Sequence, residues 1–167
     1  EFTGCEAIAA SVLALPGELH VEKKIAFAED GTLREYWDKD GWFRGSADYI
    51  SVDYDKKYAR VFDWKSGKVR DNNDQLERMA LGIFWTFPHV EKVRAAFVYP
   101  VADVPVKPTT YVKEDVPHIM AKLVSVVRRV EHAIEANQFP PSPSGLCKQW
   151  CDVMSCQFNG RRAKTEA

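Results

Sequence analysis

The chain has 167 residues and a mass of 19.0 kDa, which is enough for a single domain, 1–167, with a substantial hydrophobic core. Hydrophobic residues make up 46% and charged residues 28%, the balance of a soluble globular protein, and no apolar run approaches the length of a membrane span. The formal net charge of −1 excludes a protein that binds nucleic acid through its bulk charge, so such contacts have to come from local basic clusters.

Turn residues and hydrophobic periodicity divide the sequence into strands and helices. The expected elements, in chain order, are a helix over 4–15, strands over 18–28, 32–37, 42–53 and 58–65, a helix over 71–87, strands over 92–101 and 109–112, and a helix over 115–137. Strands that precede and follow helices in this order predict an α/β fold, with a mixed β-sheet and flanking helices.

The expected strand over 58–65 carries an acid and a base on one face. Because side chains alternate along a strand, that face presents, in order, Ala59, Val61, Asp63 and Lys65. Charges at the end of a buried strand face are costly unless they pair with each other or bind a metal ion. The pattern therefore indicates either an ordinary ion pair or a catalytic site.

A second acid, Asp48, lies on the preceding strand, which the short polar segment 55–57 joins to the next. If the two strands pair as a hairpin, Asp48 comes within reach of Asp63. Carboxylates are typical ligands of Mg²⁺, which keeps several water molecules and also binds substrate phosphate. Lys65 could orient a bound water and stabilise negative charge. Gln75, early on the following helix, could hold the nucleophile or a nucleotide.

Basic residues follow this strand directly. Gly67 allows the chain to turn sharply, and Lys68 and Arg70 come next in the sequence. Since lysine and arginine neutralise the phosphates of a nucleic acid backbone, we expect Lys68 and Arg70 to contribute to DNA binding.

The order and spacing of these residues resemble the PD-(D/E)XK nuclease superfamily, in particular its RecB-like branch. In that branch a Gly-x-x-Asp strand precedes an Asp-Tyr-Lys-Thr-Gly strand and a helix that carries glutamine. The corresponding segments here run from Gly45 to Asp48 and from Asp63 to Gly67, and the glutamine is Gln75. The resemblance implies a restriction-endonuclease-like fold, in which helices flank a mixed β-sheet.

The resemblance also implies a function, that of a metal-dependent DNA exonuclease in recombination, repair or phage DNA processing. Asp48 and Asp63 would bind Mg²⁺ or Mn²⁺. Lys65 would activate the water and stabilise the transition state, and Gln75 would position the reactants. The expected partner is DNA, as linear ends or single strands, with no membrane partner. The start of the sequence shows no signal peptide, so we expect the protein in the cytoplasm, or in the host cytoplasm if it is phage-encoded.

Two positions depart from the pattern of the family. Met79 stands where relatives often carry tyrosine, and Ile8 stands where they tend to carry a histidine metal ligand. Glu22 is a tentative replacement for that ligand, and Glu6 and Glu18 are alternatives. The departures favour a second hypothesis, a non-catalytic module that retains the nuclease fold and binds DNA ends or a partner protein.

Tryptophan side chains near these segments could stack on the bases of single-stranded DNA. The candidates are Trp37, Trp42 and Trp64. We expect packing inside the protein for at least two of them.

A cysteine-bearing tail at about 138–160 follows a stretch rich in proline and serine. It contains Cys147, Cys151 and Cys156, and Cys5 lies far upstream. This distribution resembles the iron–sulfur staple of some RecB-like relatives, so a 4Fe-4S cluster is one hypothesis, and Zn²⁺ held by the same thiolates is another. Unligated thiols are an alternative, and disulfides are disfavoured without a transport signal.

Overall fold

The computed structural model describes residues 5–69, 73–100 and 106–161. Over these residues the chain divides into two compact units, Glu1–Ser125 and Val126–Ala167. The first unit contains α1 (Cys5–Leu13), β1 (Glu18–Phe27), β2 (Phe43–Asp53), β3 (Tyr58–Trp64), α2 (Asp74–Thr86), β4 (Lys92–Val98), β5 (Thr109–Val112), the 3₁₀ helix η1 (Lys113–Asp115) and the start of α3 (Val116–Glu135). The rest of α3 and the short helix α4 (Leu146–Gln149) belong to the second unit.

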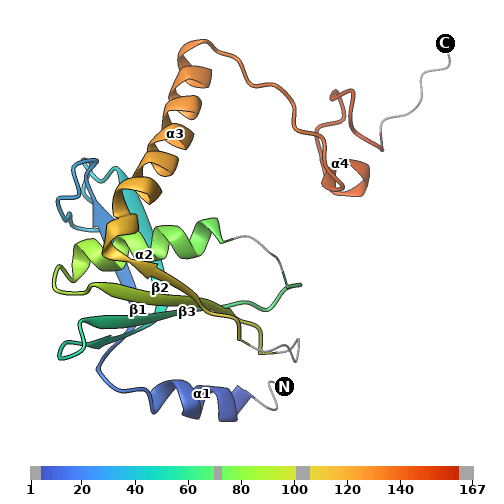
Figure 1. Ribbon diagram of the computed structural model, residues 1–167. Coiled ribbons are helices and arrows are strands. Elements are labelled where there is room, and N and C mark those ends of the chain that lie inside the picture. The colour runs from blue at the N-terminus through green and yellow to red at the C-terminus, as the bar shows by residue number, and fades with distance from the viewer. Residues whose placement is uncertain (1–4, 70–72, 101–105, 162–167) are drawn as a thin grey trace. The chain divides into compact units, whose positions relative to one another are not determined.

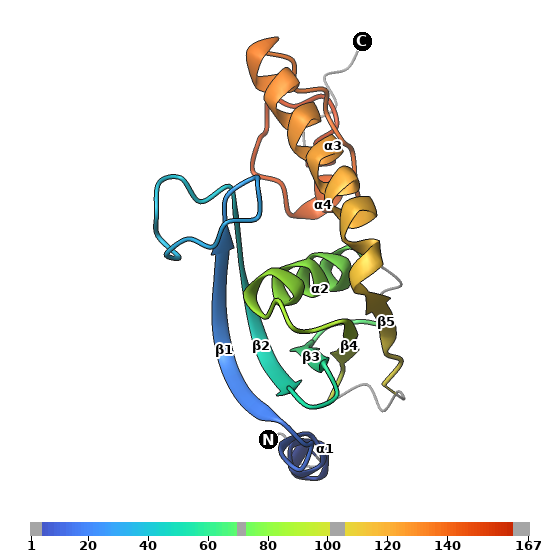
Figure 2. The ribbon, with the colours of Figure 1, turned by 60° about the vertical axis from the view of Figure 1, so that its left-hand side comes forward.

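The strands of the described chain form a mixed sheet in the order β1-β2-β3-β4-β5 (Figure 2). Strands β1, β2 and β3 pair antiparallel in succession, β4 runs parallel to β3, and β5 pairs antiparallel with β4. A parallel pair needs a crossover connection, and α2 supplies it between β3 and β4. The expected α/β class, with a mixed sheet and flanking helices, is therefore confirmed.

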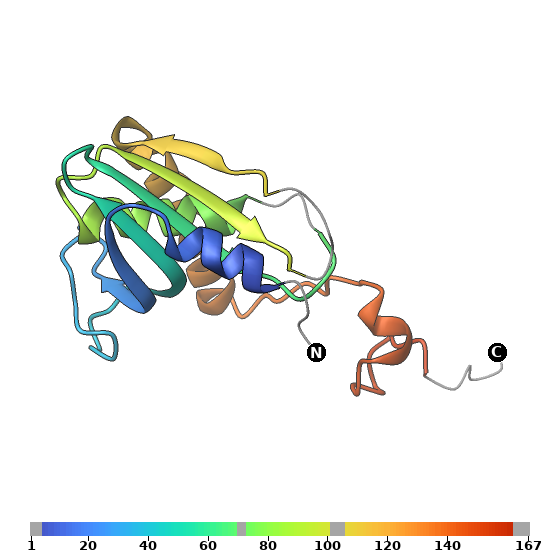
Figure 3. The ribbon, with the colours of Figure 1, turned by 90° about the horizontal axis from the view of Figure 1, so that it is seen from below.

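Helices α1 and α2 lie on opposite faces of this sheet (Figure 1, Figure 3). The apolar stripe of α2 is fully buried against the strands and includes Leu76, Ala80, Ile83 and Phe84. On the other face, the hydroxyl of Tyr49 donates a hydrogen bond of 2.6 Å to the carbonyl of Val12 in α1. Helix α2 thus covers one face of the central strands, whereas the β3 side chains on the other face are only half-buried.

At Glu22, strand β1 changes which of its two faces it turns toward α2. This residue has a φ of 51°, in the left-handed region, and the β1–β2 register omits both Glu22 and the opposing Asp48. Before Glu22 the even-numbered His20 packs against the end of α2, and after it the odd-numbered Ile25 packs against the middle of that helix. Like a β-bulge, this irregularity interrupts the pairing and bends the strand, and β1 and β2 curve across the sheet (Figure 2).

The expected strand over 32–37 is wrong. Within that range the described chain pairs only at Leu33, which forms an isolated bridge with Phe27. The guanidinium of Arg44 donates a hydrogen bond of 2.7 Å to the carbonyl of Tyr36 and holds the segment in a series of turns. The side chain of Arg44 thus supplies a partner that a neighbouring strand would otherwise have to provide.

The other expected elements are confirmed to within a few residues, except for the ends at 4, 71–72 and 101, which lie outside the described residues. Helices η1 and α4 are additions that the periodicity of the sequence does not predict. None of the helices in the described ranges is long and apolar enough to cross a membrane.

The turn from α1 into β1 depends on a glycine. Gly17 has a φ of +114°, and a Cβ added there would clash with the carbonyl oxygen of Val52. Because both the backbone conformation and this contact oppose a side chain, we expect Gly17→Ala to lower the free energy of unfolding by about 1–3 kcal/mol. Chemical denaturation measures this change. The control is Gly67→Ala, where no described atom lies within 4 Å of the added Cβ and the change should stay below about 0.5 kcal/mol.

The stability of the first unit should fall in strong alkali because of Tyr111 in β5. Burial, and then the nearby charge of Glu77, raises the pKa of Tyr111 from 10.0 to about 12. The phenol therefore stays protonated in the folded chain at pH values where the unfolded chain releases the proton, so its contribution is complete below about pH 10 and is lost as the pH rises toward about 12. Tyr111→Phe should lose less stability than the wild type over this range. Parallel curves of unfolding free energy against pH would contradict the assignment.

Candidate active site at the ends of β2 and β3

Where the β2–β3 ladder stops, the side-chain carboxylate of Asp48 takes the place of a backbone carbonyl as a hydrogen-bond acceptor. The last paired residues are Tyr49 and Phe62, and continuing this register by one residue places Asp48 opposite Asp63. The next amide available on β3, that of Trp64, donates a hydrogen bond of 2.8 Å to Oδ2 of Asp48. The carboxylate of Asp48 is thereby fixed where the pairing of β2 with β3 ends, opposite Asp63 in the continued register.

Asp63 is a buried carboxylate held from two sides. Only 5% of the residue is exposed. The amide Nε2 of Gln75, in the first turn of α2, donates a hydrogen bond of 2.8 Å to Oδ1. The Nζ of Lys65 lies 2.5 Å from Oδ2, as an ion pair and without the alignment of a hydrogen bond. The structure thus brings together the acid, the base and the amide that the sequence singled out.

The position of Lys65 follows from the parallel pairing of β3 with β4. Its backbone amide donates a hydrogen bond of 2.8 Å to the carbonyl of Val98 and so extends the ladder past the end of β3. The side chain then lies on the same face as Asp63, as the alternation of the strand requires. Since removing one member of a buried ion pair leaves an uncompensated charge, Lys65 also stabilises the fold around Asp63.

The oxygen donors where the pairing of β2 with β3 ends fit a hard divalent cation such as Mg²⁺ or Mn²⁺. Oδ1 of Asp48 makes no hydrogen bond to the described chain, and Oδ2 of Asp63 is a buried oxygen that accepts no hydrogen bond from it. Magnesium commonly uses one or two carboxylates and completes its coordination with water and substrate phosphate. Asp48 and Asp63 are therefore suitable ligands on chemical grounds.

The tentative third ligand, Glu22, lies on β1 at the position that faces Asp48, and its side chain is exposed. Within the described ranges, no group of three or more His, Cys, Asp or Glu side chains is arranged to hold a metal ion. A role for Glu22 as a metal ligand stays a prediction.

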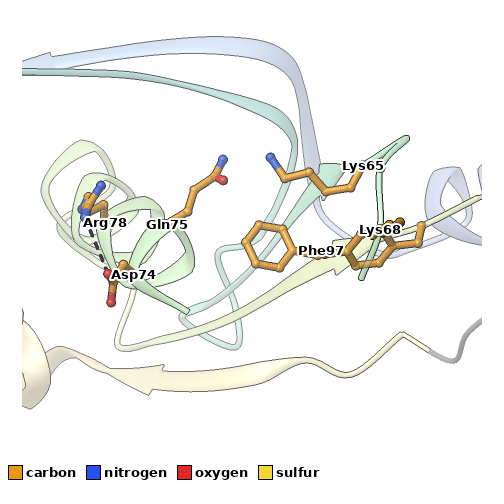
Figure 4. Close-up of a pocket in the computed structure, with 8 residues that line it drawn as sticks. Lys65, Lys68, Asp74, Gln75, Arg78 and Phe97 are labelled. Carbon is orange, nitrogen blue, oxygen red and sulfur yellow. Dashed lines mark ion pairs between the residues drawn. The ribbon is translucent and has the colours of Figure 1, made fainter. Parts of the chain in front are cut away.

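A hollow of about 370 Å³ opens beside Lys65 and Gln75, the two residues that contact Asp63 (Figure 4). Its lining residues come from the loop after β3, the start of α2 and the end of β4, and we call it the basic hollow: Lys65, Gly67, Lys68, Asp74, Gln75, Arg78, Phe97 and Tyr99. Among these described residues the positive charges exceed the negative ones. Lys68, which was expected to contact DNA, lines the basic hollow, whereas Arg70 lies outside the described residues.

Arg78, Phe97 and Tyr99 also line the basic hollow, although they were not among the site residues predicted from the sequence. A helical period of three would have placed Arg78 beside Gln75 on the surface of α2. The strand period of two would have placed Phe97 and Tyr99 on one face of β4 and just beyond it. These signals were present, but each was weaker than the apolar pattern of the helix or strand to which it belongs.

The tryptophans differ in their environments. Trp42 is partly buried and packs against the core, and Trp64 is half-buried on β3. Trp37 is 78% exposed, and its ring lies edge-on to that of Tyr36 at 4.8 Å. A stacking role for Trp37 stays a prediction.

The cysteines of the second unit lie in a turn-rich segment. Cys147, Cys151 and Cys156 are free and half-buried. Asn159 is buried, and its amide donates hydrogen bonds of 3.0 Å to the carbonyls of Cys151 and Val153. Cys5 belongs to the first unit, and its side chain lies outside the described part of the chain. The iron–sulfur cluster and the zinc site therefore both stay predictions.

Comparison of the chain with protein families, with curated proteins and with solved structures gives no match. What the site can do therefore follows from its own residues, a pair of aspartates with a lysine and a glutamine beside a basic hollow.

The hydrogen bond from Trp64 to Asp48 separates a structural role of this carboxylate from a role in catalysis. Asp48→Ala leaves the amide without its acceptor and should cost about 1–3 kcal/mol of unfolding free energy. Asp48→Asn keeps an acceptor oxygen and should cost less than about 1 kcal/mol, although it removes the charge that a metal ion needs. Thermal or chemical denaturation measures both, and Asp55→Ala, an exposed acid on the neighbouring turn, is the control. Equal stability of the two Asp48 variants would contradict the structural role.

Proposed function

We propose that this chain is a metal-dependent nuclease that hydrolyses phosphodiester bonds in DNA. The observation that carries the proposal is the placement of buried Asp63 between Lys65 and Gln75, opposite Asp48 where the pairing of β2 with β3 ends. A carboxylate pair, an ammonium group and a basic hollow in one place supply what hydrolysis of a phosphate diester needs. The resemblance of the motifs to RecB-like nucleases further supports an exonuclease of recombination, repair or phage DNA processing.

The roles of the residues follow from their contacts. Asp48 and Asp63 would hold Mg²⁺ or Mn²⁺, which would lower the pKa of a bound water and neutralise charge on the scissile phosphate. Lys65 reaches from Asp63 into the basic hollow, so its ammonium can orient the attacking water and stabilise negative charge on the phosphate. Gln75 fixes the orientation of the Asp63 carboxylate through its amide. In the reaction the water oxygen bonds to phosphorus and gives up a proton, the bond to the leaving oxygen breaks, and that oxygen takes up a proton.

The test is digestion of end-labelled linear DNA, single- and double-stranded, with Mg²⁺ or Mn²⁺ and with an EDTA control. Asp63→Asn and Lys65→Gln remove the charges while keeping side chains of similar size, and each should slow cleavage by about 100-fold or more. The matched control is the exposed ion pair of Lys57 and Glu91, 2.6 Å apart and remote from the site. Lys57→Gln and Glu91→Gln should cleave at the wild-type rate.

Intact DNA with either metal, from protein shown to be folded by circular dichroism, would overturn the nuclease proposal. If the same protein then retained DNA in EDTA, the non-catalytic binding module would take its place. A rise in melting temperature with Mn²⁺ that Asp63→Asn abolishes would locate metal binding at this site independently of cleavage.

A further inference from the structure

We infer that the basic hollow binds a single nucleotide unit of the DNA strand, with its phosphate on Arg78 and its base against Phe97. This inference rests on the proposed nuclease function, which it deepens by assigning residues that the nuclease motifs do not include. Figure 4 shows Arg78 on α2 and Lys68 after β3, with the ring of Phe97 between the two elements.

The cations of Arg78 and Lys68 are available to a phosphate. Arg78 meets Asp74 only at 4.0 Å, between side chains that are both exposed, so this ion pair is weak and leaves guanidinium donors unused. Lys68 is exposed and makes no ion pair or hydrogen bond within the described ranges. Lys65, by contrast, is held by Asp63. The planar guanidinium of Arg78 matches a phosphate, which it can bind through two parallel hydrogen bonds.

Phe97 provides an apolar surface next to the catalytic carboxylate. It is the direct partner of Asp63 in the parallel β3–β4 register, so both side chains lie on the face that α2 covers. Its ring is half-buried, and Lys65 Nζ lies 5.3 Å from the ring centroid. Tyr99 extends the aromatic surface, with ring centroids 6.4 Å apart at 63°. A partly exposed aromatic ring inside an otherwise polar hollow can stack a nucleobase of any sequence.

The size and the mixture of groups favour a nucleotide over a simple anion. A volume of about 370 Å³ lies in the range of small-ligand sites, about 300–1,000 Å³. Inorganic phosphate would use the cations and leave the ring without a partner, and an apolar ligand would leave the cations unpaired. A nucleoside monophosphate satisfies both, beside the carboxylate at which its neighbouring phosphodiester bond would be hydrolysed.

The experiment is calorimetric titration of the full chain in EDTA at low salt, so that no metal and no cleavage are involved. The probes are thymidine 5′-monophosphate, thymidine and inorganic phosphate. We expect the monophosphate to bind at least about five-fold more tightly than either fragment, because only the monophosphate engages the ring and the cations together. Thymidine or phosphate binding as tightly as the monophosphate would overturn the nucleotide assignment, as would the absence of saturable binding.

Two variants test which residue binds the phosphate of the ligand and which binds its base. Arg78→Gln should weaken the monophosphate about ten-fold and leave thymidine unchanged. Phe97→Leu should weaken the monophosphate and thymidine by about five-fold or more and leave inorganic phosphate unchanged, and Phe97→Tyr should restore binding. The control is Arg94→Gln, an exposed arginine on the opposite face of β4. Wild-type affinity of both Arg78→Gln and Phe97→Leu would overturn the inference.

Failure of the nucleotide inference is distinguishable from failure of the proposed nuclease function. Binding of the monophosphate that depends on Arg78, in a protein that never cleaves DNA, would retain the subsite and remove the nuclease. Cleavage that depends on Asp63, with no effect of Arg78→Gln or Phe97→Leu on nucleotide affinity, would retain the nuclease and remove the subsite.

Discussion

A carboxylate buried inside a β-sheet is costly unless its charge is compensated, and Asp63 imposes that constraint on its surroundings. Lys65 has to follow it on the same face of β3, and α2 has to begin where Gln75 can reach its other oxygen. An apolar residue at this position would make both requirements unnecessary. The start of α2, the end of β3 and the loop between them are thus arranged around one charge, and this arrangement is what makes the site suitable for chemistry.

Topology determines which further side chains meet that charge. The crossover through α2 makes β4 the parallel neighbour of β3, so Phe97 lies directly beside Asp63. On the other side, the ladder between β2 and β3 ends one residue early, and Asp48 replaces the missing acceptor for the amide of Trp64. At the end of β3, Asp63 therefore has an acid, Asp48, on its antiparallel side and an aromatic surface on its parallel side. Neither neighbour alone would give both.

Much of this arrangement could be predicted from the sequence, because it depends on local periods. Alternation along β3 placed Asp63 with Lys65, and the helical pattern after the loop placed Gln75 at the start of α2. The segment 32–37 was predicted wrongly because the side chain of Arg44, and not a neighbouring strand, supplies the hydrogen-bond partner at the carbonyl of Tyr36, which no local pattern reveals. The basic hollow was missed for a similar reason, since it combines a helix and a strand whose adjacency depends on the order of the sheet.

Strand β1 is an edge of the sheet, and exposed edges can recruit strands from other chains into aggregates. The left-handed conformation at Glu22 counters this risk, because a strand that bends and exchanges its two faces is a poor template for a straight partner. It also fixes the β1–β2 hairpin in place, since a slip of one residue would force Val21 or Lys23 into that conformation, which is especially unfavourable for β-branched valine. The kink thus protects the molecule against mispairing, both within its own hairpin and with its neighbours in concentrated solution.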